Sequence, residues 1–585
     1  MTTTKEARSP AWYPAWAQEL GQVYSAGTTS TFLLHGNVDD LVRVAAGQPV
    51  EYLALSEFLA SQVFGAFDVV LHYDLTRPPR ALAGRDRERL QEMNAHVDRY
   101  LGKLQELPRD PTQVLALLNR YLELMLVGKS DEQRPKVAVV LEYAQLLLPS
   151  TQASQTSGQL AANLATVLNW AKNPYIKRVN FAFCLVSEKL SDLHEALVRN
   201  PHTERIELPY PDEAARLAFI DWMRAGRPAA ELSDVAPELL AKLTAGLTLV
   251  NLQGLLHGAL RHQRPISLAQ LKQFKKEMIE GTCQGMVEFV EPKHTLEMVV
   301  GHGAAKQRLE EDAALIRDNH LEAAPMGYLL CGPVGTGKSF LAECYAGSIG
   351  IPCLKLLNFR SKYVGETEGN LEKILKMLRA MGPVVVMIDE ADAALGDRQQ
   401  EGDSGTSGRV FAQIASQMGD TAYRGRIIWF LMTCRPDLLP IDIKRQGRAE
   451  VHLALFYPET PDEIRQMFVI LGRKLRLPIR VEDVPTVGDL KLSGADIEGI
   501  VNRARRLMLM EKTETVTAAQ LRRVIDDFIP SAEDAEKRMQ ELGAVLECTE
   551  LPMLPERYQT QVRTAAGKAT LLRQFEELRL QVEGR

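Results

Sequence analysis

The stretch GYLLCGPVGTGKSF, residues 327–340, decides the fold of this 585-residue chain. Its apolar start, Tyr328 to Cys331, predicts a short strand, and the residues after Ser339 have the apolar spacing of a helix. The turn between them fits the pattern GxxxxGK[ST]. A strand, a glycine-rich turn and a helix in this order indicate an α/β fold with an anion-binding loop.

The glycines of this turn let backbone N–H groups face inward around an anion, and the helix dipole adds to the attraction. Lys338 can reach the β- and γ-phosphates of a nucleotide, and the Ser339 hydroxyl can bind Mg²⁺. We therefore expect ATP and Mg²⁺ as cofactors. The residues expected to contact the nucleotide here are Gly332, Pro333, Val334, Gly335, Thr336, Gly337, Lys338, Ser339 and Phe340.

A second element, PVVVMIDEAD, occupies residues 383–392 and ends in two carboxylates. A run that is apolar on both faces belongs in the middle of a parallel sheet, and ligands bind at the carboxyl ends of such strands. There Asp389 would complete the Mg²⁺ shell, and Glu390 would polarise the attacking water. Such a pair can also be a plain helix cap, but behind a phosphate loop we favour the catalytic role.

A third element, IIWFLMTCRPDLLPIDIKRQGR, runs from residue 427 to 448 and ends with Arg445 and Arg448. Two arginines at this spacing can simply belong to a solvated helix end. Beside an ATP site they can instead reach the γ-phosphate bound by a neighbouring subunit, as arginine fingers. Fingers that act on a neighbour imply a ring of subunits.

These blocks together resemble the AAA family of AAA+ ATPases over about residues 295–530. In that family the segment before the phosphate loop contacts adenine, which here implies Val300 and Gly301. The family's helical lid faces adenine and ribose, which implies Gly494 and Ala495. The resemblance also implies ATP hydrolysis, a homo-oligomer of hexameric type and mechanical work on a protein substrate.

A candidate pore loop lies between the two nucleotide elements, where Lys362 precedes the triplet Tyr363, Val364 and Gly365. In related AAA unfoldases an aromatic–hydrophobic–glycine triplet at this place projects into the central pore and grips polypeptide. A flat ring on a mobile loop can hold any extended chain by apolar contact. The alternative is a tyrosine packed at a strand end. The polar loop 396–408 is either a second pore loop or an ordinary surface loop.

Two positions depart from the family pattern. Cys434 stands where the family usually has an asparagine that helps to align the lytic water. A thiol is only a weak hydrogen-bonding group, so we expect slow hydrolysis or a reliance on Thr433. The segment from Met298 to Gly301 also differs, which should alter the rim of the adenine pocket without abolishing it.

The first half of the chain repeats the second half at an offset near 247 residues. KVAVVLEYAQLLLP (136–149) aligns with the carboxylate strand, and residues 181–220 align with the third element. The chemistry is missing, because TFLLHGNVDDLVRV (31–44) has no Gly-Lys-Ser and Glu142-Tyr143 replace Asp-Glu. We expect a folded first module that does not hydrolyse ATP and binds little or none of it.

The expected fold is therefore α/β, with two tandem AAA+ modules that each have a parallel-sheet core and a small helical lid. The join resembles the linker of tandem AAA proteins from cyanobacteria and plastids, which pair a degenerate first module with an active second one. Residues 76–135 are a candidate insertion, and the tail predicts two helices around Pro552 and Pro555. The expected boundaries are 1–280 for the first module, 281–297 for a linker, 298–457 for the active core, 458–530 for its lid and 531–585 for the tail.

Composition narrows the setting in which the protein works. The net charge is −6 and the charged fraction is 25%, which is typical of a globular protein and argues against a nucleic-acid partner. The cysteines are seven in number without C-x-x-C pairs, which favours a reducing compartment over a disulfide framework or a zinc site. With neither an apolar signal core nor a membrane-length run, we expect a cytoplasmic protein.

The sequence thus predicts an ATP-driven ring ATPase that remodels or threads protein substrates, with hydrolysis only in the second module. One alternative is a nucleotide-dependent switch or scaffold with slow hydrolysis, which Cys434 and the degenerate first half favour. A second alternative is a DNA-associated AAA+ loader, which the acidic charge and the aromatic triplet disfavour.

Overall fold

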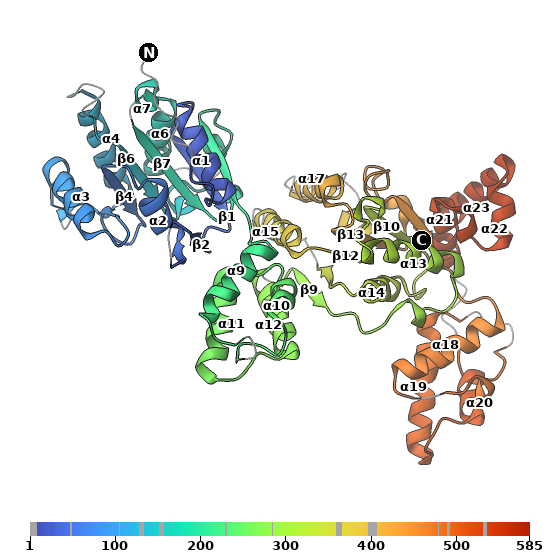
Figure 1. Cartoon of the computed structure of the whole chain (residues 1–585). Coiled ribbons are helices and arrows are strands. Elements are labelled where there is room, and N and C mark those ends of the chain that lie inside the picture. Colours follow the sequence, from blue (N-terminus) through green and yellow to red (C-terminus); the bar gives the residue numbers. More distant parts are fainter. Residues whose placement is uncertain are drawn as a thin grey trace. The chain divides into compact units, whose positions relative to one another are not determined.

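The computed structural model describes residues 9–46, 49–103, 106–127, 134–150, 157–178, 180–228, 231–283, 285–357, 366–395, 406–477, 479–487, 492–529 and 535–584. The chain divides into two compact units, one made of Met1–Met278 with Glu368–Ala380 and the other of Ile279–Thr367 with Met381–Arg585 (Figure 1). Each unit is described by itself. No helix within the described residues is both long and apolar enough to cross a membrane.

The first unit is built on a sheet of six strands in the order β5-β4-β6-β7-β1-β8. Neighbouring strands are parallel, except that the edge strand β5 runs antiparallel to β4. The strands are β1 (Thr31–Gly36), β4 (Val69–Tyr73), β5 (Arg80–Ala81), β6 (Val137–Leu141), β7 (Phe181–Ser187) and β8 (Thr203–Leu208).

Both faces of this sheet are covered, because its central strands are apolar on both sides. Along β1, Phe32 and Leu34 pack into one buried cluster while Leu33 packs into another on the opposite face. Helices α1 and α2 supply the first cluster, and helices α4 and α6 supply the second. The helices of this layer are α1 (Ala15–Ser25), α2 (Leu55–Phe58), α3 (Arg87–Tyr100), α4 (Pro111–Val127), α5 (Ala144–Leu147), α6 (Gly158–Lys172), α7 (Pro174–Arg178) and α8 (Glu195–Val198).

A small helical bundle follows the sheet and has its own apolar core, which includes Phe219, Leu240 and Leu256. Its helices are α9 (Glu213–Arg224), α10 (Pro237–Leu243), α11 (Leu249–His262) and α12 (Leu268–Thr282). The segment 76–135, a candidate insertion, contains β5, α3 and α4.

The second unit contains a sheet of the same kind, in the order β14-β10-β13-β12-β11-β9. Its strands are β9 (Val287–Val290), β10 (Gly327–Cys331), β11 (Cys353–Leu356), β12 (Val384–Ile388), β13 (Ile427–Thr433) and β14 (Val451–Ala454). The edge strand β9 is again antiparallel, to β11, and it lies within the segment 281–297 that the sequence suggested as a linker. That segment therefore contributes to the second sheet.

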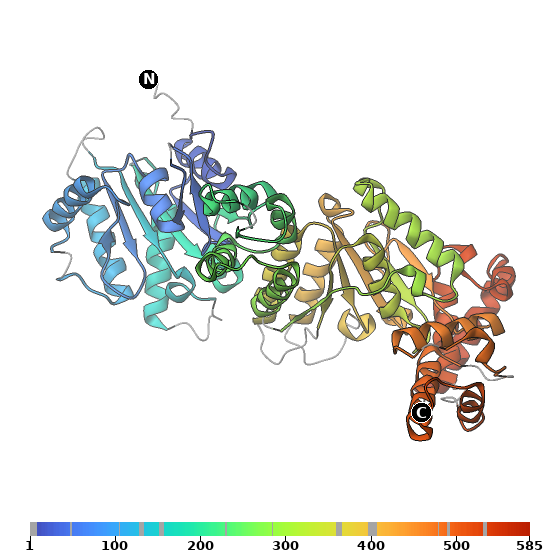
Figure 2. The ribbon, with the colours of Figure 1, turned by 60° about the horizontal axis from the view of Figure 1, so that its bottom comes forward.

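The helices of the second unit form three groups (Figure 2). Those that accompany the sheet are α13 (Gly303–Arg317), α14 (Lys338–Ile349), α16 (Ala391–Leu395) and α17 (Thr406–Met418). Helix α15 (Glu366–Met381) has most of its residues, Glu368–Ala380, in the first unit. The lid has its own buried core and consists of α18 (Pro461–Lys474), α19 (Gly494–Glu511) and α20 (Ala518–Asp526). The tail consists of α21 (Ala535–Glu547), α22 (Glu556–Val562) and α23 (Ala565–Glu583), so it has three helices where the sequence suggested two.

The two sheets have equivalent topology, which confirms the expected α/β fold with two tandem modules. Strands β8, β1, β7, β6, β4 and β5 correspond in order to β14, β10, β13, β12, β11 and β9. A glycine ends β1 and another directly follows β10, because at both places a neighbouring carbonyl oxygen leaves no room for a Cβ atom. A Cβ on Gly36 would lie 2.6 Å from the Leu208 carbonyl oxygen, and one on Gly332 would lie 2.3 Å from that of Leu455.

Candidate nucleotide site

The phosphate loop joins β10 to α14, as the sequence predicted. Gly335 and Gly337 both have φ of +84°, a left-handed conformation that a glycine adopts without strain. Helix α14 begins at Lys338, so its N-terminal N–H groups face the loop. The Lys338 ammonium donates to the carbonyl oxygens of Gly332 at 2.8 Å and Pro333 at 3.0 Å. The loop therefore has the concave backbone and the single cation that a phosphate chain requires.

The carboxylate strand brings Asp389 to this loop. The Ser339 hydroxyl donates to the Asp389 carboxylate at 3.2 Å, so the two expected Mg²⁺ ligands lie side by side. Lys355, at the end of β11, also contacts Asp389, with 3.1 Å between its Nζ and the carboxylate oxygen. Hydroxyl and carboxylate oxygens are what Mg²⁺ prefers, usually alongside nucleotide phosphates and waters. The donor set therefore fits a metal ion that arrives with a nucleotide.

Glu390 follows in a strained conformation, with φ of +46°. A non-glycine residue adopts this region at a cost, and such strain tends to occur at functional sites. The side chain of Glu390 is exposed. Since β12 ends two residues earlier, at Ile388, Glu390 stands at the carboxyl edge of the sheet, where a catalytic base for water would be needed.

Cys434 lies directly against Lys338, with 3.3 Å between its sulfur and the ammonium nitrogen. Burial raises the pKa of the Cys434 thiol, although the neighbouring Lys338 charge opposes the rise. The group is thus a neutral thiol at physiological pH. Its neighbour Thr433 donates to Asp392 at 2.6 Å.

A cavity of about 210 Å³ lies beside the loop, between the sheet and the lid. Its walls are mostly apolar, which suits a flat nucleobase. The predicted residues Val300, Phe340, Gly494 and Ala495 line this cavity, and Gly301 does not. A Cβ on Gly301 would instead approach the Glu463 carboxylate at 3.4 Å. Further lining residues are Met298, Val299, His302, Gly335, Thr336, Gly337, Leu341, Leu455, Met467, Ile470, Leu471, Lys474 and Glu498.

The lid is joined to the loop by backbone contact. Ser493 caps α19 and forms a reciprocal capping box with Asp496, and the Gly494 N–H donates to the Gly335 carbonyl at 3.1 Å. The residues of the predicted lid motif therefore reach the phosphate loop itself.

Family models match three parts of the chain. The model described as "AAA+ chaperone, N-terminal Rossmann-like domain" matches residues 9–209, and "AAA+ chaperone, second helical domain" matches residues 214–284. The model "ATPase family associated with various cellular activities (AAA)" matches residues 328–457, which hold the phosphate loop and the carboxylate strand.

The chain belongs to the AAA+ ATPases.

Similar proteins agree with this assignment. A cell division cycle protein 48 homolog from Archaeoglobus fulgidus is 28% identical over 337 residues, which cover 52% of this chain and 45% of the relative. The ATP-dependent zinc metalloprotease FtsH 3 of Sphaerobacter thermophilus is 28% identical over 324 residues, 52% of this chain and 66% of the relative. An FtsH from Acidimicrobium ferrooxidans is 30% identical over 224 residues, 36% of this chain and 34% of the relative. The chain thus spans two thirds or less of these relatives.

The two candidate arginine fingers of this AAA+ ATPase lie after η10 (Pro436–Leu438), in the turn before β14. Arg445 is exposed, and the Arg448 guanidinium donates to the Asp442 carbonyl oxygen at 2.8 Å. Neither arginine lines the cavity beside the phosphate loop of its own chain.

The candidate pore residues Lys362, Tyr363, Val364 and Gly365 lie outside the described residues, and so does most of the loop 396–408. Helix α15 begins directly after the triplet, at Glu366.

Besides the unpredicted cavity residues, sequence reasoning missed Lys355, which binds Asp389, and Tyr457 and Gln540, which bind the phosphate loop. Lys355 is the only charged residue in the short strand β11, and a cation at the carboxyl end of a strand was the signal that could have found it. The Tyr457 hydroxyl donates to the Val334 carbonyl oxygen, and the Gln540 amide accepts from the Val334 N–H. No local pattern marks either residue.

The first module is built differently at the corresponding place. After Gly36 the chain enters a hairpin of β2 (Leu41–Val44) and β3 (Glu51–Ala54) in place of a phosphate loop and helix. The Asp40 carboxylate is buried and accepts hydrogen bonds from the N–H groups of Leu249 at 3.0 Å and Val250 at 2.9 Å, at the start of α11. An internal carboxylate thus occupies the helix N-terminus that an anion would otherwise approach.

The carboxylate strand of the first module keeps the geometry of the second. Tyr143 has φ of +54° where Glu390 has +46°, each following its strand at the same distance. His72 and Glu142 lie 3.1 Å apart, in the same strand register as Lys355 and Asp389. The backbone and a contact between a nitrogen-bearing side chain and a carboxylate persist, whereas the phosphate loop and the carboxylate at the position of Glu390 do not.

Proposed function

We propose that this chain is a ring-forming AAA+ ATPase that remodels or threads protein substrates and hydrolyses ATP only in its second module. The observation that carries the proposal is the contrast between the modules. Lys338, Ser339 and Asp389 converge on the second module's loop, whereas in the first module a hairpin follows β1 and the Asp40 carboxylate binds the start of α11. The domain boundaries expected from the sequence belong to this proposal, as does a cytoplasmic location.

The residues take the following roles. Lys338 and the loop backbone bind the β- and γ-phosphates, and Ser339 and Asp389 hold Mg²⁺, which supplies charge stabilisation for phosphoryl transfer. Glu390 orients and deprotonates the attacking water. Arg445 and Arg448 act on the nucleotide of the neighbouring subunit, in a homo-oligomer of hexameric type. Tyr363, with Lys362, Val364 and Gly365, grips the substrate in the central pore.

The switch or scaffold with slow hydrolysis remains a second candidate, because Cys434 replaces a polar amide beside Lys338. The two functions differ in how hydrolysis responds to substrate. A remodelling ATPase should turn over ATP faster when a permanently unfolded protein is added, and a switch should not.

The decisive experiment compares the full chain with Lys338→Ala, Glu390→Gln and Tyr363→Ala variants. Titration calorimetry with Mg²⁺ and ATP should find one site per chain in the native protein, one in Glu390→Gln and none in Lys338→Ala. Residual ATP binding by Lys338→Ala would assign a working site to the first module and contradict the proposal.

Tyr363→Ala tests threading. Basal turnover and melting temperature should stay near those of the native chain, while stimulation by an unfolded protein is lost; Tyr363→Phe should restore it, because the apolar ring does the gripping. A Tyr363→Ala chain that responds normally to substrate would favour the switch.

A further inference from the structure

The C-terminal tail is an integral part of the nucleotide core. Helix α21 buries Met539, Leu542, Ala544 and Val545. Ion pairs reinforce this packing, with 2.9 Å between Lys444 and Glu547 and 3.0 Å between Arg308 and Glu550. The tail therefore has a fixed position relative to β10 and the phosphate loop of its own unit.

Both backbone polar groups of Val334, a residue of the phosphate loop, form hydrogen bonds. Its N–H donates to the Gln540 amide oxygen at 3.2 Å, and its carbonyl oxygen accepts from the Tyr457 hydroxyl at 2.8 Å. Gln540 is 4% exposed, and its amide nitrogen donates to Glu536, which fixes the direction of the oxygen. Burial raises the pKa of Tyr457, so its hydroxyl stays a donor.

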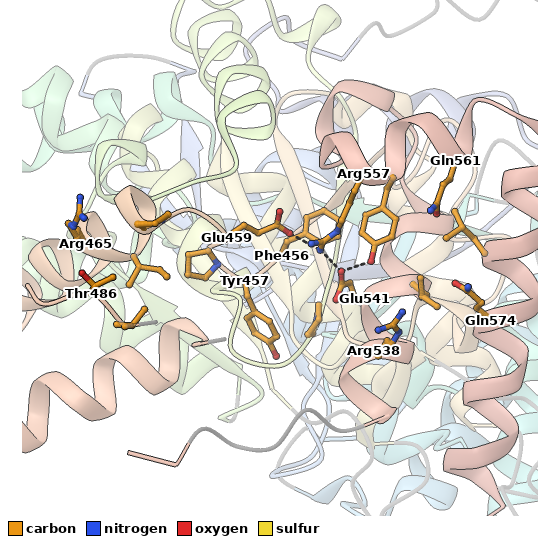
Figure 3. Close-up of a pocket in the computed structure, with 18 of the residues that line it drawn as sticks. Phe456, Tyr457, Glu459, Arg465, Thr486, Arg538, Glu541, Arg557, Gln561 and Gln574 are labelled. Atoms are coloured by element: carbon orange, nitrogen blue, oxygen red, sulfur yellow. Dashed lines mark hydrogen bonds and ion pairs between the residues drawn. The ribbon is translucent and has the colours of Figure 1, made fainter. Parts of the chain in front are cut away.

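Behind this point lies a cavity of about 610 Å³ whose walls come from the loop, the lid and the tail (Figure 3). Arg557 of the tail reaches across it to Glu459 at 2.6 Å and to Glu541 at 2.7 Å, and the Tyr558 hydroxyl also donates to Glu541. The tail is thus tied to the segment that carries Tyr457 as well as to the loop.

We propose that Gln540 is a positioning residue for ATP binding, through which the tail helix holds the phosphate loop in its binding conformation. The Val334 N–H donates to the tail, so its bond to Gln540 does not compete with phosphates for the other N–H groups of the loop or for the Lys338 ammonium. Glycines at 332, 335 and 337 make the loop costly to order, and a pre-ordered loop binds its ligand more tightly. The inference rests on the ATPase activity alone, not on a ring or on threading.

The test replaces Gln540 by methionine, which keeps the length of the side chain but removes the amide oxygen. The KM for ATP and the dissociation constant of the ATP complex should both rise about fivefold, which corresponds to the loss of one neutral hydrogen bond. The kcat should stay within about twofold, because bound nucleotide orders the loop itself. Gln581→Met, the same change at an exposed position of α23 that does not line the cavity, is the matched control and should leave both constants unchanged.

A second variant keeps the test independent of tail packing. Tyr457→Phe removes the other hydrogen bond to Val334 and should raise the same two constants. The proposal is overturned if Gln540→Met lowers the melting temperature without changing ATP affinity, or if kcat falls while KM is unchanged. If the native chain binds ATP but does not hydrolyse it, the proposed ATPase function is wrong. The ATP affinities of the variants would still decide the role of Gln540.

Discussion

Cys434 is the residue at which we expect this site to differ from that of a fast ATPase. Its sulfur lies 3.3 Å from the Lys338 ammonium, and burial keeps the thiol protonated. A thiol aligns a water poorly compared with an amide. We expect Cys434→Asn to raise kcat by roughly tenfold, since small gains in the alignment of reacting groups change rates strongly.

Steady-state ATPase assays at saturating ATP would measure this effect. Cys434→Ser, which has a short hydroxyl and no amide, is the matched control and should change kcat much less. An unchanged or lower rate for Cys434→Asn would show that the thiol does not limit hydrolysis.

Single residues of the site differ in how far the sequence could predict them. Lys338, Ser339 and Asp389 follow from local patterns, because a phosphate loop and a carboxylate after a buried strand each have a fixed spacing. Gln540 contacts Val334 across 206 residues of sequence, and nothing in the surrounding tail marks it. Family position assigns Gly301 to the adenine pocket, but the cavity is lined by its neighbours Val300 and His302 and not by Gly301.

At the scale of elements, Asp40 anchors the lid of the first module to its sheet. Its carboxylate accepts hydrogen bonds from the Leu249 and Val250 N–H groups of α11. Asp40→Ala would leave these two donors without a partner, which should lower the local free energy of opening by on the order of 2 kcal/mol. That change corresponds to roughly thirtyfold faster exchange.

Hydrogen exchange at the start of α11 would report this opening directly. Asp39→Ala, at the exposed neighbouring position, is the control and should leave the exchange rates unchanged. Equal protection in the Asp40→Ala chain would mean that apolar packing alone holds α11.

Helix α21 is anchored by a contact that depends on pH. His452 and Glu547 lie 3.2 Å apart, and Lys444 also binds Glu547. Burial acts to lower the pKa of His452, but the hydrogen bond and charge of Glu547 outweigh it and the pKa is raised above 6.5. Burial likewise acts to raise the pKa of Glu547, but His452 and Lys444 outweigh it and the pKa falls below 4.5.

The contact therefore stabilises the fold most between about pH 4.5 and 6.5. The contribution of His452 is lost as the pH rises from 6.5 through its folded-state pKa, and that of Glu547 is lost as the pH falls through its own. We expect His452→Gln to lower the melting temperature more at pH 6 than at pH 9. His320→Gln, at an exposed position, should show no such difference.

At the scale of the whole molecule, the sequence predicted two modules because a repeat preserves strand patterns even where the chemistry has been lost. The buried strands at 137–141 and 384–388 are recognisable in both copies, and both sheets share one strand order. The hairpin that replaces the first phosphate loop could not be predicted, because its residues have no counterpart in the repeat. The tail's packing also escaped prediction, since its apolar positions resemble those of any solvated helix.

A mixing experiment can test whether the subunits form a ring in which each arginine finger acts on a neighbour. Arg448 does not line the cavity of its own chain. If it acts on a neighbouring subunit, the arginine and the nucleotide site that it completes can be mutated in different chains. Arg448→Ala keeps an intact loop but lacks the finger, and Lys338→Ala keeps the finger but cannot bind ATP. Each variant alone should show strongly depressed hydrolysis.

When the two variants are co-expressed in equal amounts, roughly a quarter of the interfaces would join an intact loop to an intact finger, if subunits mix at random in a closed ring. Turnover should therefore reappear in the mixture. Arg505→Ala, at an exposed position of the lid helix α19, is the control and should hydrolyse ATP normally by itself. If the mixture shows only the sum of the two separate rates, Arg448 does not act between subunits. If Arg448→Ala alone is fully active, Arg448 is not an arginine finger, and Arg445 becomes the residue to test in the same way.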